Sequence, residues 1–121
     1  MNIHIEKGQT VMDVKHQFGN KYKGLKLEMF KKAHDSEESS NSKMRVFGTE
    51  TIDELVSVDL PVHININPEM TVSEVESAFE VQAGLHAQIF RKMRNIWIET
   101  VQTDGYTLAH QMDLSAKSTA L

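Results

Sequence analysis

The stretch Ile64–Lys92, ININPEMTVSEVESAFEVQAGLHAQIFRK, decides the fold because an earlier stretch of the chain matches it. The earlier stretch, Ile3–Lys32, reads IHIEKGQTVMDVKHQFGNKYKGLKLEMFKK and has one additional residue before Gly24. Ten pairs of positions carry the same residue: Ile3 and Ile64, Ile5 and Ile66, Thr10 and Thr71, Val11 and Val72, Val14 and Val75, Phe18 and Phe79, Gly24 and Gly84, Leu25 and Leu85, Phe30 and Phe90, Lys32 and Lys92. The match predicts an internal duplication, with two pseudo-symmetric repeats at about residues 2–58 and 62–115 in a single domain over residues 1–121.

The composition is that of a globular protein of one domain. The chain has 121 residues, of which 40% are hydrophobic and 25% are charged, and a chain of this size can bury a single core. It has no cysteine, which excludes disulfides and thiolate metal sites. No stretch has the length of a membrane-spanning helix and no signal peptide is recognisable, so we expect a cytoplasmic protein without a membrane partner.

The net charge of −4 is unevenly distributed along the chain. Residues 1–34 hold seven lysines and three acidic residues, a balance of +4, while the other six basic and fourteen acidic residues give −8. We therefore expect one basic and one acidic half-surface. A charge separation of this kind serves solubility or self-complementary association more often than nucleic-acid binding.

Alternating hydrophobicity and capping signals predict an α+β fold. Residues 2–6 alternate apolar and polar side chains, as a half-buried strand does. A helix is predicted from Thr10, where Asp13 lies at capping-box spacing, and Gly24 is expected to stop it. A strand over residues 25–30 follows, and the second repeat shows the same signals in the same order.

Beyond the matching stretches, each repeat is predicted to add a strand and a short helix. In the first repeat, the serine-rich residues 33–43 predict a mobile surface loop. A short strand and a capped helix from Thr51 follow. In the second, a tight hairpin over residues 92–99 precedes a short helix from Thr107, and the chain after Leu114 is expected to fray.

The repeated order of strand, helix and strand predicts helices packed on an antiparallel or mixed sheet. Two arrangements fit this order, a ferredoxin-like fold and a pair of small ubiquitin-like halves. Each half alone has under roughly sixty residues and would be marginally stable. We therefore expect the halves to share one core.

No motif in the sequence predicts catalysis, a cofactor or a metal ion. The six histidines fall outside HExxH and HxH spacings, and His4 and His86 occupy outward positions of predicted strands. There is no cysteine nucleophile, no GxSxG turn and no glycine-rich phosphate loop. We expect no catalytic, cofactor-binding or metal-binding residue, although folding into strands can bring distant histidines together.

One repeated feature predicts a surface for single-stranded nucleic acid. An aromatic residue and two bases end each matching strand, with a tryptophan on the adjoining strand: Phe30, Lys31, Lys32, Phe90, Arg91, Lys92 and Trp97. Aromatic rings on a sheet stack on nucleobases, and basic side chains neutralise phosphates. Packing of the phenylalanines at the strand ends is the favoured alternative, because the pI is near 5.8 and no RNP motif is present.

Trp97 is the main candidate for a protein-interaction surface. It lies between Ile96 and Ile98, so its side chain points to the opposite side of the strand. If the isoleucines are buried, Trp97 is exposed, and an exposed tryptophan is favoured at interfaces. The reverse arrangement, with Trp97 in the core, fits the sequence equally well. A hairpin strand can also form a sheet edge, where strands of two subunits can pair.

The run NPEMTVSEVESAFEVQAGLHAQIFRKMRNIWIET at residues 67–100, with its weaker copy TVMDVKHQFGNKYKGLKLEMFKK at residues 10–32, resembles a family of small bacterial proteins of unknown function. The resemblance covers nearly the whole chain and is carried by packing and capping residues. It implies no activity, cofactor or site. It favours the interpretation of the chain as a complete protein.

The sequence therefore predicts a non-enzymatic, cytoplasmic protein-interaction module that self-associates as a homo-oligomer or binds another protein. The alternative is a sheet-surface binder of single-stranded nucleic acid. A third hypothesis, an enzyme whose site is assembled from distant residues, has the least support, because no catalytic motif is present.

Overall fold

The computed structural model describes residues 2–31, 45–46, 48–56 and 58–119, and the predicted loop at residues 33–43 lies outside them. The strands are β1 Asn2–Ile5, β2 Leu25–Phe30, β3 Arg45–Val46, β4 Val62–Asn65, β5 His86–Met93 and β6 Ile96–Glu99. The helices are α1 Val11–Lys21, α2 Val72–Ala83 and α3 Leu108–Thr119, with short 3₁₀ helices η2 Ile52–Glu54 and η3 Val101–Thr103.

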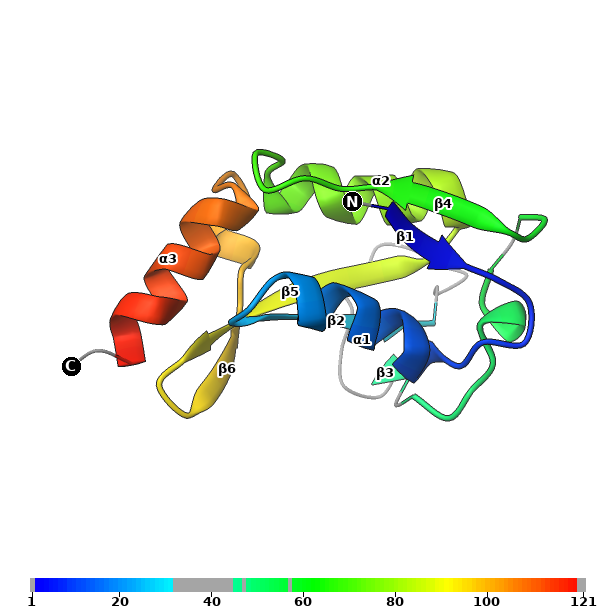
Figure 1. Cartoon of the computed structure of the whole chain (residues 1–121), viewed down its shortest axis with the longest axis horizontal. Coiled ribbons are helices and arrows are strands. Elements are labelled where there is room, and N and C mark those ends of the chain that lie inside the picture. The colour runs from blue at the N-terminus through cyan, green and yellow to red at the C-terminus, as the bar shows by residue number, and fades with distance from the viewer. Residues whose placement is uncertain (1, 32–44, 47, 57, 120–121) are drawn as a thin grey trace.

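The strands form two antiparallel sheets (Figure 1). β1 and β4 make a two-stranded ribbon, and the large sheet has the strand order β3-β2-β5-β6. α1 packs on β1 and β2, α2 packs on β4 and β5, and α3 packs on β5 and β2. The predicted α+β class, with helices on antiparallel sheets, is confirmed.

Both main helices begin at the threonines that the sequence indicates. Thr10 Oγ1 accepts a hydrogen bond from the Asp13 N–H at 3.2 Å, and the Asp13 carboxylate accepts one from the Thr10 N–H at 2.9 Å. Thr71 and Glu74 form the same reciprocal pair before α2. Each box satisfies two backbone donors that a first helical turn leaves free. The third predicted cap is wrong, because Thr51 makes no side-chain hydrogen bond to η2.

The C-terminal ends of the two helices differ. Gly84 follows α2 in the left-handed conformation at φ 66°, as predicted. α1 ends earlier than predicted, at Lys21, and Gly24 instead leads the chain into β2 at φ 87°. A Cβ atom on Gly24 would lie 2.5 Å from Ser115 Oγ of α3. This glycine therefore permits both a turn and the close approach of α3.

Corresponding positions of the two matching stretches face one another in both sheets. Ile3 is opposite Ile64 in the ribbon, and Glu28 is opposite Gln88 in the large sheet. A twofold axis through these two pairs would exchange the halves of the chain, because an antiparallel pair of like strands is itself twofold.

The two halves also close in the same way. An isolated bridge joins Thr10, before α1, to Thr51, before η2, and a second joins Thr71, before α2, to Thr107, before α3. η2 and α3 therefore occupy corresponding places in the two halves. The duplication remains a proposal, which these pairings support.

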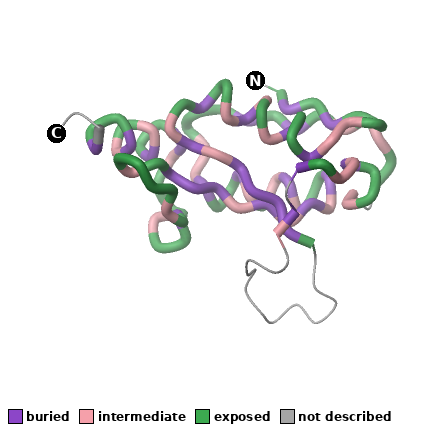
Figure 2. Tube along the Cα trace, turned by 90° about the horizontal axis from the view of Figure 1, so that it is seen from below, coloured by how far each residue is buried: buried purple, intermediate pink, exposed green. Residues whose placement is uncertain are grey.

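The core lies between the ribbon, the helices and one face of the large sheet, and Figure 2 shows buried residues along the middle of the chain trace. Matching residues fill matching parts of it: Ile3, Ile5, Val11, Val14, Phe18 and Leu25 in one half, and Ile64, Ile66, Val72, Val75, Phe79 and Leu85 in the other. The halves thus share one core, as a chain of this length requires.

α3 is longer than the sequence predicts. The expectation that the chain frays after Leu114 is wrong, since the helix continues to Thr119. Ser115 and Ser118 are buried, and Ser118 Oγ accepts a hydrogen bond from the Arg94 N–H at 3.0 Å. Buried polar groups are paired in this way, and hydrophobic periodicity does not reveal them. No helix in the described part of the chain has the length and apolarity that crossing a membrane requires.

We expect Phe18→Ala and Phe79→Ala to lower the free energy of unfolding by similar amounts, about 3–5 kcal/mol each. Both rings are fully buried, at corresponding positions of α1 and α2. Val81→Ala is the control, because its side chain is 76% exposed and its loss should change stability by less than about 0.5 kcal/mol. Urea unfolding followed by circular dichroism measures all three. A large loss at only one phenylalanine would contradict the equivalence of the helices.

Candidate functional site

The two faces of the large sheet differ in chemistry. Side chains alternate between faces along a strand, and directly opposed residues on neighbouring strands share a face. Leu25, Leu27 and Met29 of β2 join the core. The opposite side, called here the outer face, carries Lys26, Glu28 and Phe30 from β2, Arg45 from β3, His86, Gln88, Phe90 and Lys92 from β5, and Trp97 and Glu99 from β6.

Aromatic rings and cations are layered on the outer face. The Lys26 ammonium lies 5.5 Å from the Phe90 ring centroid and 4.9 Å from that of Trp97. The Arg45 guanidinium lies 5.6 Å from the Phe90 centroid and 5.8 Å from that of Phe30. These distances suit cation–π attraction, which holds the cations over the rings. The Phe30 and Phe90 rings are buried, at 5% and 6% exposure, although they lie on the outer face.

Glu28 lies at the centre of these charges. Its carboxylate is 2.5 Å from Lys15 Nζ, 3.2 Å from Lys26 Nζ and 3.7 Å from the Arg45 guanidinium. Burial would raise the pKa of Glu28, but the hydrogen bonds and charges of Lys15 and Lys26 hold it below its ordinary value. The carboxylate is therefore ionised at neutral pH. Three cations share one anion, so this cluster has an excess of positive charge.

The structure brings four of the seven predicted site residues onto one face. Phe30, Phe90, Lys92 and Trp97 all lie on the outer face, and Lys92 Nζ is 6.0 Å from the Trp97 ring centroid. Lys31 follows the end of β2 and is exposed. Arg91 is separated from these residues, and residue 32 lies outside the described part of the chain.

Arg91 does not belong to the surface on which the sequence placed it. It is opposite Leu25 and Ile98, on the face that joins the core. It is 8% exposed, and its guanidinium donates a hydrogen bond to the Gln111 side chain of α3. The grouping of Phe90, Arg91 and Lys92 as one cluster is therefore wrong, because successive strand residues point to opposite faces.

Four charged residues of the outer face, Lys26, Glu28, Arg45 and Glu99, were missed in the sequence. Lys26 and Glu28 alternate with the leucines of β2, and this alternation could have placed them beside Phe30 and Phe90. Arg45 gave no such signal, because its position depends on the pairing of β3 with β2, which the local sequence does not encode.

The hairpin strand β6 is apolar on both sides. It lies at one edge of the large sheet, next to β5. Trp97 is 39% exposed on the outer face, while Ile96, on the other side of the strand, is 63% exposed. Neither sequence interpretation is complete, since both faces of the strand carry an exposed apolar side chain. Val101, just beyond the strand, is exposed as well.

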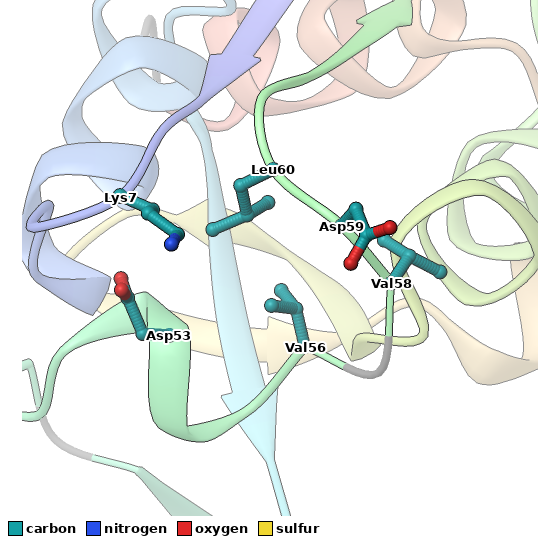
Figure 3. A pocket seen from close by; sticks show the side chains of 6 residues that line it. All are labelled: Lys7, Asp53, Val56, Val58, Asp59 and Leu60. Atoms are coloured by element: carbon teal, nitrogen blue, oxygen red, sulfur yellow. The ribbon is translucent and has the colours of Figure 1, made fainter.

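Three of the hollows on the described surface are defined by their lining residues. One of about 410 Å³ lies beside β6, lined by Arg91, Ile98, Glu99, Val101, Gln102 and Thr103. A second, of about 330 Å³, is lined by Phe30, Lys31, Glu54, Leu55, Gly84, Leu85 and His86. The third, of about 320 Å³, is lined by Lys7, Asp53, Val56, Val58, Asp59 and Leu60, and Figure 3 shows the ends of Lys7 and Asp53 directed toward one another. None of these three places a hydroxyl nucleophile beside a histidine.

Glu76 of α2 has a strongly altered acidity. Burial raises the pKa of its carboxyl to about 7, with a contribution from Asp104, although the Ile89 N–H donates a hydrogen bond to it at 2.9 Å. A carboxyl of this acidity suits general acid–base chemistry. It lines none of the three hollows, so we assign it a structural role at the edge of β5.

Comparison with known proteins identifies no relative. No family model matches this chain, and comparisons with curated proteins and with solved structures give no significant match. The resemblance to small bacterial proteins therefore stays a prediction. Function has to be argued from the geometry of the chain itself.

We expect stability to fall as the pH rises from about 4.5 toward 7 because of Glu76. Its folded-state pKa of about 7 lies above the ordinary glutamate value of 4.5, so the folded state binds the proton more tightly. The stabilising contribution is complete below the unfolded-state pKa and is lost as the pH passes the folded-state pKa, by up to about 3 kcal/mol. Urea unfolding at pH 5 and pH 8 measures this loss.

Glu76→Gln should remove that pH dependence, because the amide oxygen can still accept the Ile89 N–H but cannot ionise. Glu69→Gln, at an exposed position, should keep it. An equally steep decline in the Glu76→Gln variant would assign the effect to another group.

Proposed function

We propose that this chain is a non-enzymatic, cytoplasmic interaction module that associates with a second copy of itself through β6. The observation that carries this proposal is the exposure of apolar side chains on both sides of an edge strand. Edge strands of monomeric proteins are ordinarily protected by charge, proline or a cover, because their free backbone groups invite pairing. β6 carries Ile96, Trp97 and Ile98 instead.

The exposed apolar residues are concentrated at this end of the molecule. Seven large hydrophobic side chains are exposed among the described residues, and three of them, Ile96, Trp97 and Val101, lie within six consecutive positions. Figure 1 shows the β5–β6 hairpin projecting from the body of the protein beside α3. Exposed apolar side chains gathered at one strand of a small protein are typical of a binding surface.

The backbone of β6 is arranged to pair with another strand. Met93 is opposite Ile96 across a two-residue turn, which makes them a hydrogen-bonded pair of the hairpin. Hydrogen-bonded pairs alternate with non-bonded ones, so the N–H and C=O groups of Trp97 and Glu99 are directed away from β5. These groups form the free edge at which an added strand would bind.

A second copy of β6 complements this edge. In an antiparallel pairing centred on Trp97, the two tryptophans oppose one another on the outer face, and Ile96 of each copy opposes Ile98 of the other. Both faces of the joint sheet would then bury apolar surface. A contact in which the same residues serve both partners is the ordinary form of a homodimer interface.

We expect Trp97→Lys and Ile96→Lys each to weaken self-association at least about tenfold, which corresponds to roughly 1.4 kcal/mol. Each substitution places a charge in the apolar centre of the interface. Val81→Lys, at an exposed position of α2, is the matched control and should associate like the parent protein. Sedimentation velocity over a range of concentrations measures the dissociation constants. A parent protein that stays monomeric at millimolar concentration would overturn the proposal.

A second candidate function is favoured by the charge excess on the outer face. Lys26 and Lys92 lie there beside Trp97, Arg45 lies over the Phe90 ring, and Glu28 and Glu99 are the acidic residues of that face in the described part of the chain. This arrangement suits the phosphates of a single-stranded nucleic acid, with Trp97 as a stacking ring. The buried Phe30 and Phe90 rings offer no free surface for stacking, which is why this function ranks second.

If the outer face binds single-stranded RNA or DNA, Lys26→Ala and Arg45→Ala should each weaken binding, and the affinity should fall steeply as the salt concentration rises. Lys21→Ala is the control, because Lys21 is exposed at the end of α1. Fluorescence anisotropy with a labelled oligonucleotide at several salt concentrations measures this. Absent or salt-independent binding would reject the second function and leave the first unaffected.

A further inference from the structure

Two histidines from distant parts of the chain meet on the ribbon. His4 of β1 is directly opposite His63 of β4, and both side chains are exposed. Their Nδ1 atoms are 2.5 Å apart, their ring centroids are 4.6 Å apart, and the ring planes are inclined by 82°. The Nδ1 atoms of two separate imidazoles are therefore within hydrogen-bond distance of one another on the exposed side of the ribbon.

The backbone beneath this pair is firmly held. The His4 N–H donates a hydrogen bond to Gln17 Oε1 at 2.8 Å, and Gln17 Nε2 donates one to the His4 carbonyl at 2.7 Å. These bonds occupy the edge of β1 that does not pair with β4. On the other side of the ribbon, Ile3 and Ile64 are fully buried. The spacing of the two histidine backbones is thus fixed, and only the exposed rings can adjust.

We propose that His4 and His63 bind a divalent transition-metal ion through their Nδ1 atoms. Neutral imidazole nitrogen is a preferred ligand of zinc, nickel and copper ions. Zinc–nitrogen bonds of about 2.0–2.1 Å at a tetrahedral angle place two ligand atoms about 3.3 Å apart. The rings reach this separation by a displacement of less than about 1 Å, which unhindered side-chain rotation supplies. Water completes the coordination, because the site faces solvent.

Such an ion would connect the two halves of the chain. The histidines are 59 positions apart in the sequence, and they come together only when β1 and β4 pair. An unfolded chain does not present the two nitrogens together, so metal binding favours the folded state. The inference is independent of the function proposed for β6, since the ribbon and the large sheet are separate sheets.

The test uses the full chain, freed of metal with a chelator and titrated with zinc ions. Calorimetry should show saturable binding of one zinc ion per chain, and the melting temperature should rise with zinc concentration. His4→Gln and His63→Gln should each weaken binding at least tenfold and abolish the rise. His16→Gln, which removes an exposed histidine of α1, is the matched control and should bind like the parent. Magnesium, which prefers oxygen ligands, should have no effect.

A second measurement does not depend on variants. In the parent protein, NMR signals of the His4 and His63 rings should shift together on addition of zinc, while those of His16 and His110 should not. Overturning results are an absence of zinc binding up to millimolar concentration, binding that survives in both glutamine variants, and a ratio of one ion to two chains. Any of these would leave the pair as two histidines in contact without a metal ion.

Discussion

The pairing of β2 with β5 is the constraint on which the rest of the structure depends. These strands come from different halves of the chain and run opposite one another over six residue pairs, from Leu25 with Arg91 to Phe30 with His86. The register decides which side chains enter the core and which reach the outer face, because a shift of one residue would exchange the two sets. It also positions β3 and β6, since each pairs with one of these central strands.

The same pairing links the two surfaces to which we assign functions. Lys26, opposite Phe90, contacts the ring of Trp97 on β6, so the outer face and the edge strand are in direct contact. A charge bound on the outer face would therefore act on the proposed interface through Lys26. Arg91, on the opposite side of the same strand, instead ties β5 to α3. β5 thus carries part of the outer face on one side, contacts α3 on the other, and pairs with the apolar edge strand β6.

The features predicted from the sequence are those with local causes. The two capping boxes were predictable because a threonine and an acidic residue three positions later lie in one turn, and the α+β class follows from alternation and helical periodicity. The alternation of side chains along a strand also predicts that Arg91 points to the face opposite Phe90 and Lys92. Arg45 and the meeting of His4 with His63 could not be predicted, because both depend on strand pairing between distant segments. The same is true of α3, whose last turns are held by buried hydrogen bonds.

The division of both sheets between the two halves has a consequence for synthesis of the protein. The first half is made before β4 and β5 exist, so β1 leaves the ribosome without its partner strand, and β2 can pair only with the two-residue strand β3. Of the helices that pack on the two sheets, only α1 is then present to cover their apolar faces, and strands that lack their partners are prone to aggregate or to bind chaperones. Native structure can spread through the first half only once the second half is available. Each half therefore needs the other to complete its sheets. A chain interrupted near its middle would be prone to aggregate and would not fold as a smaller domain.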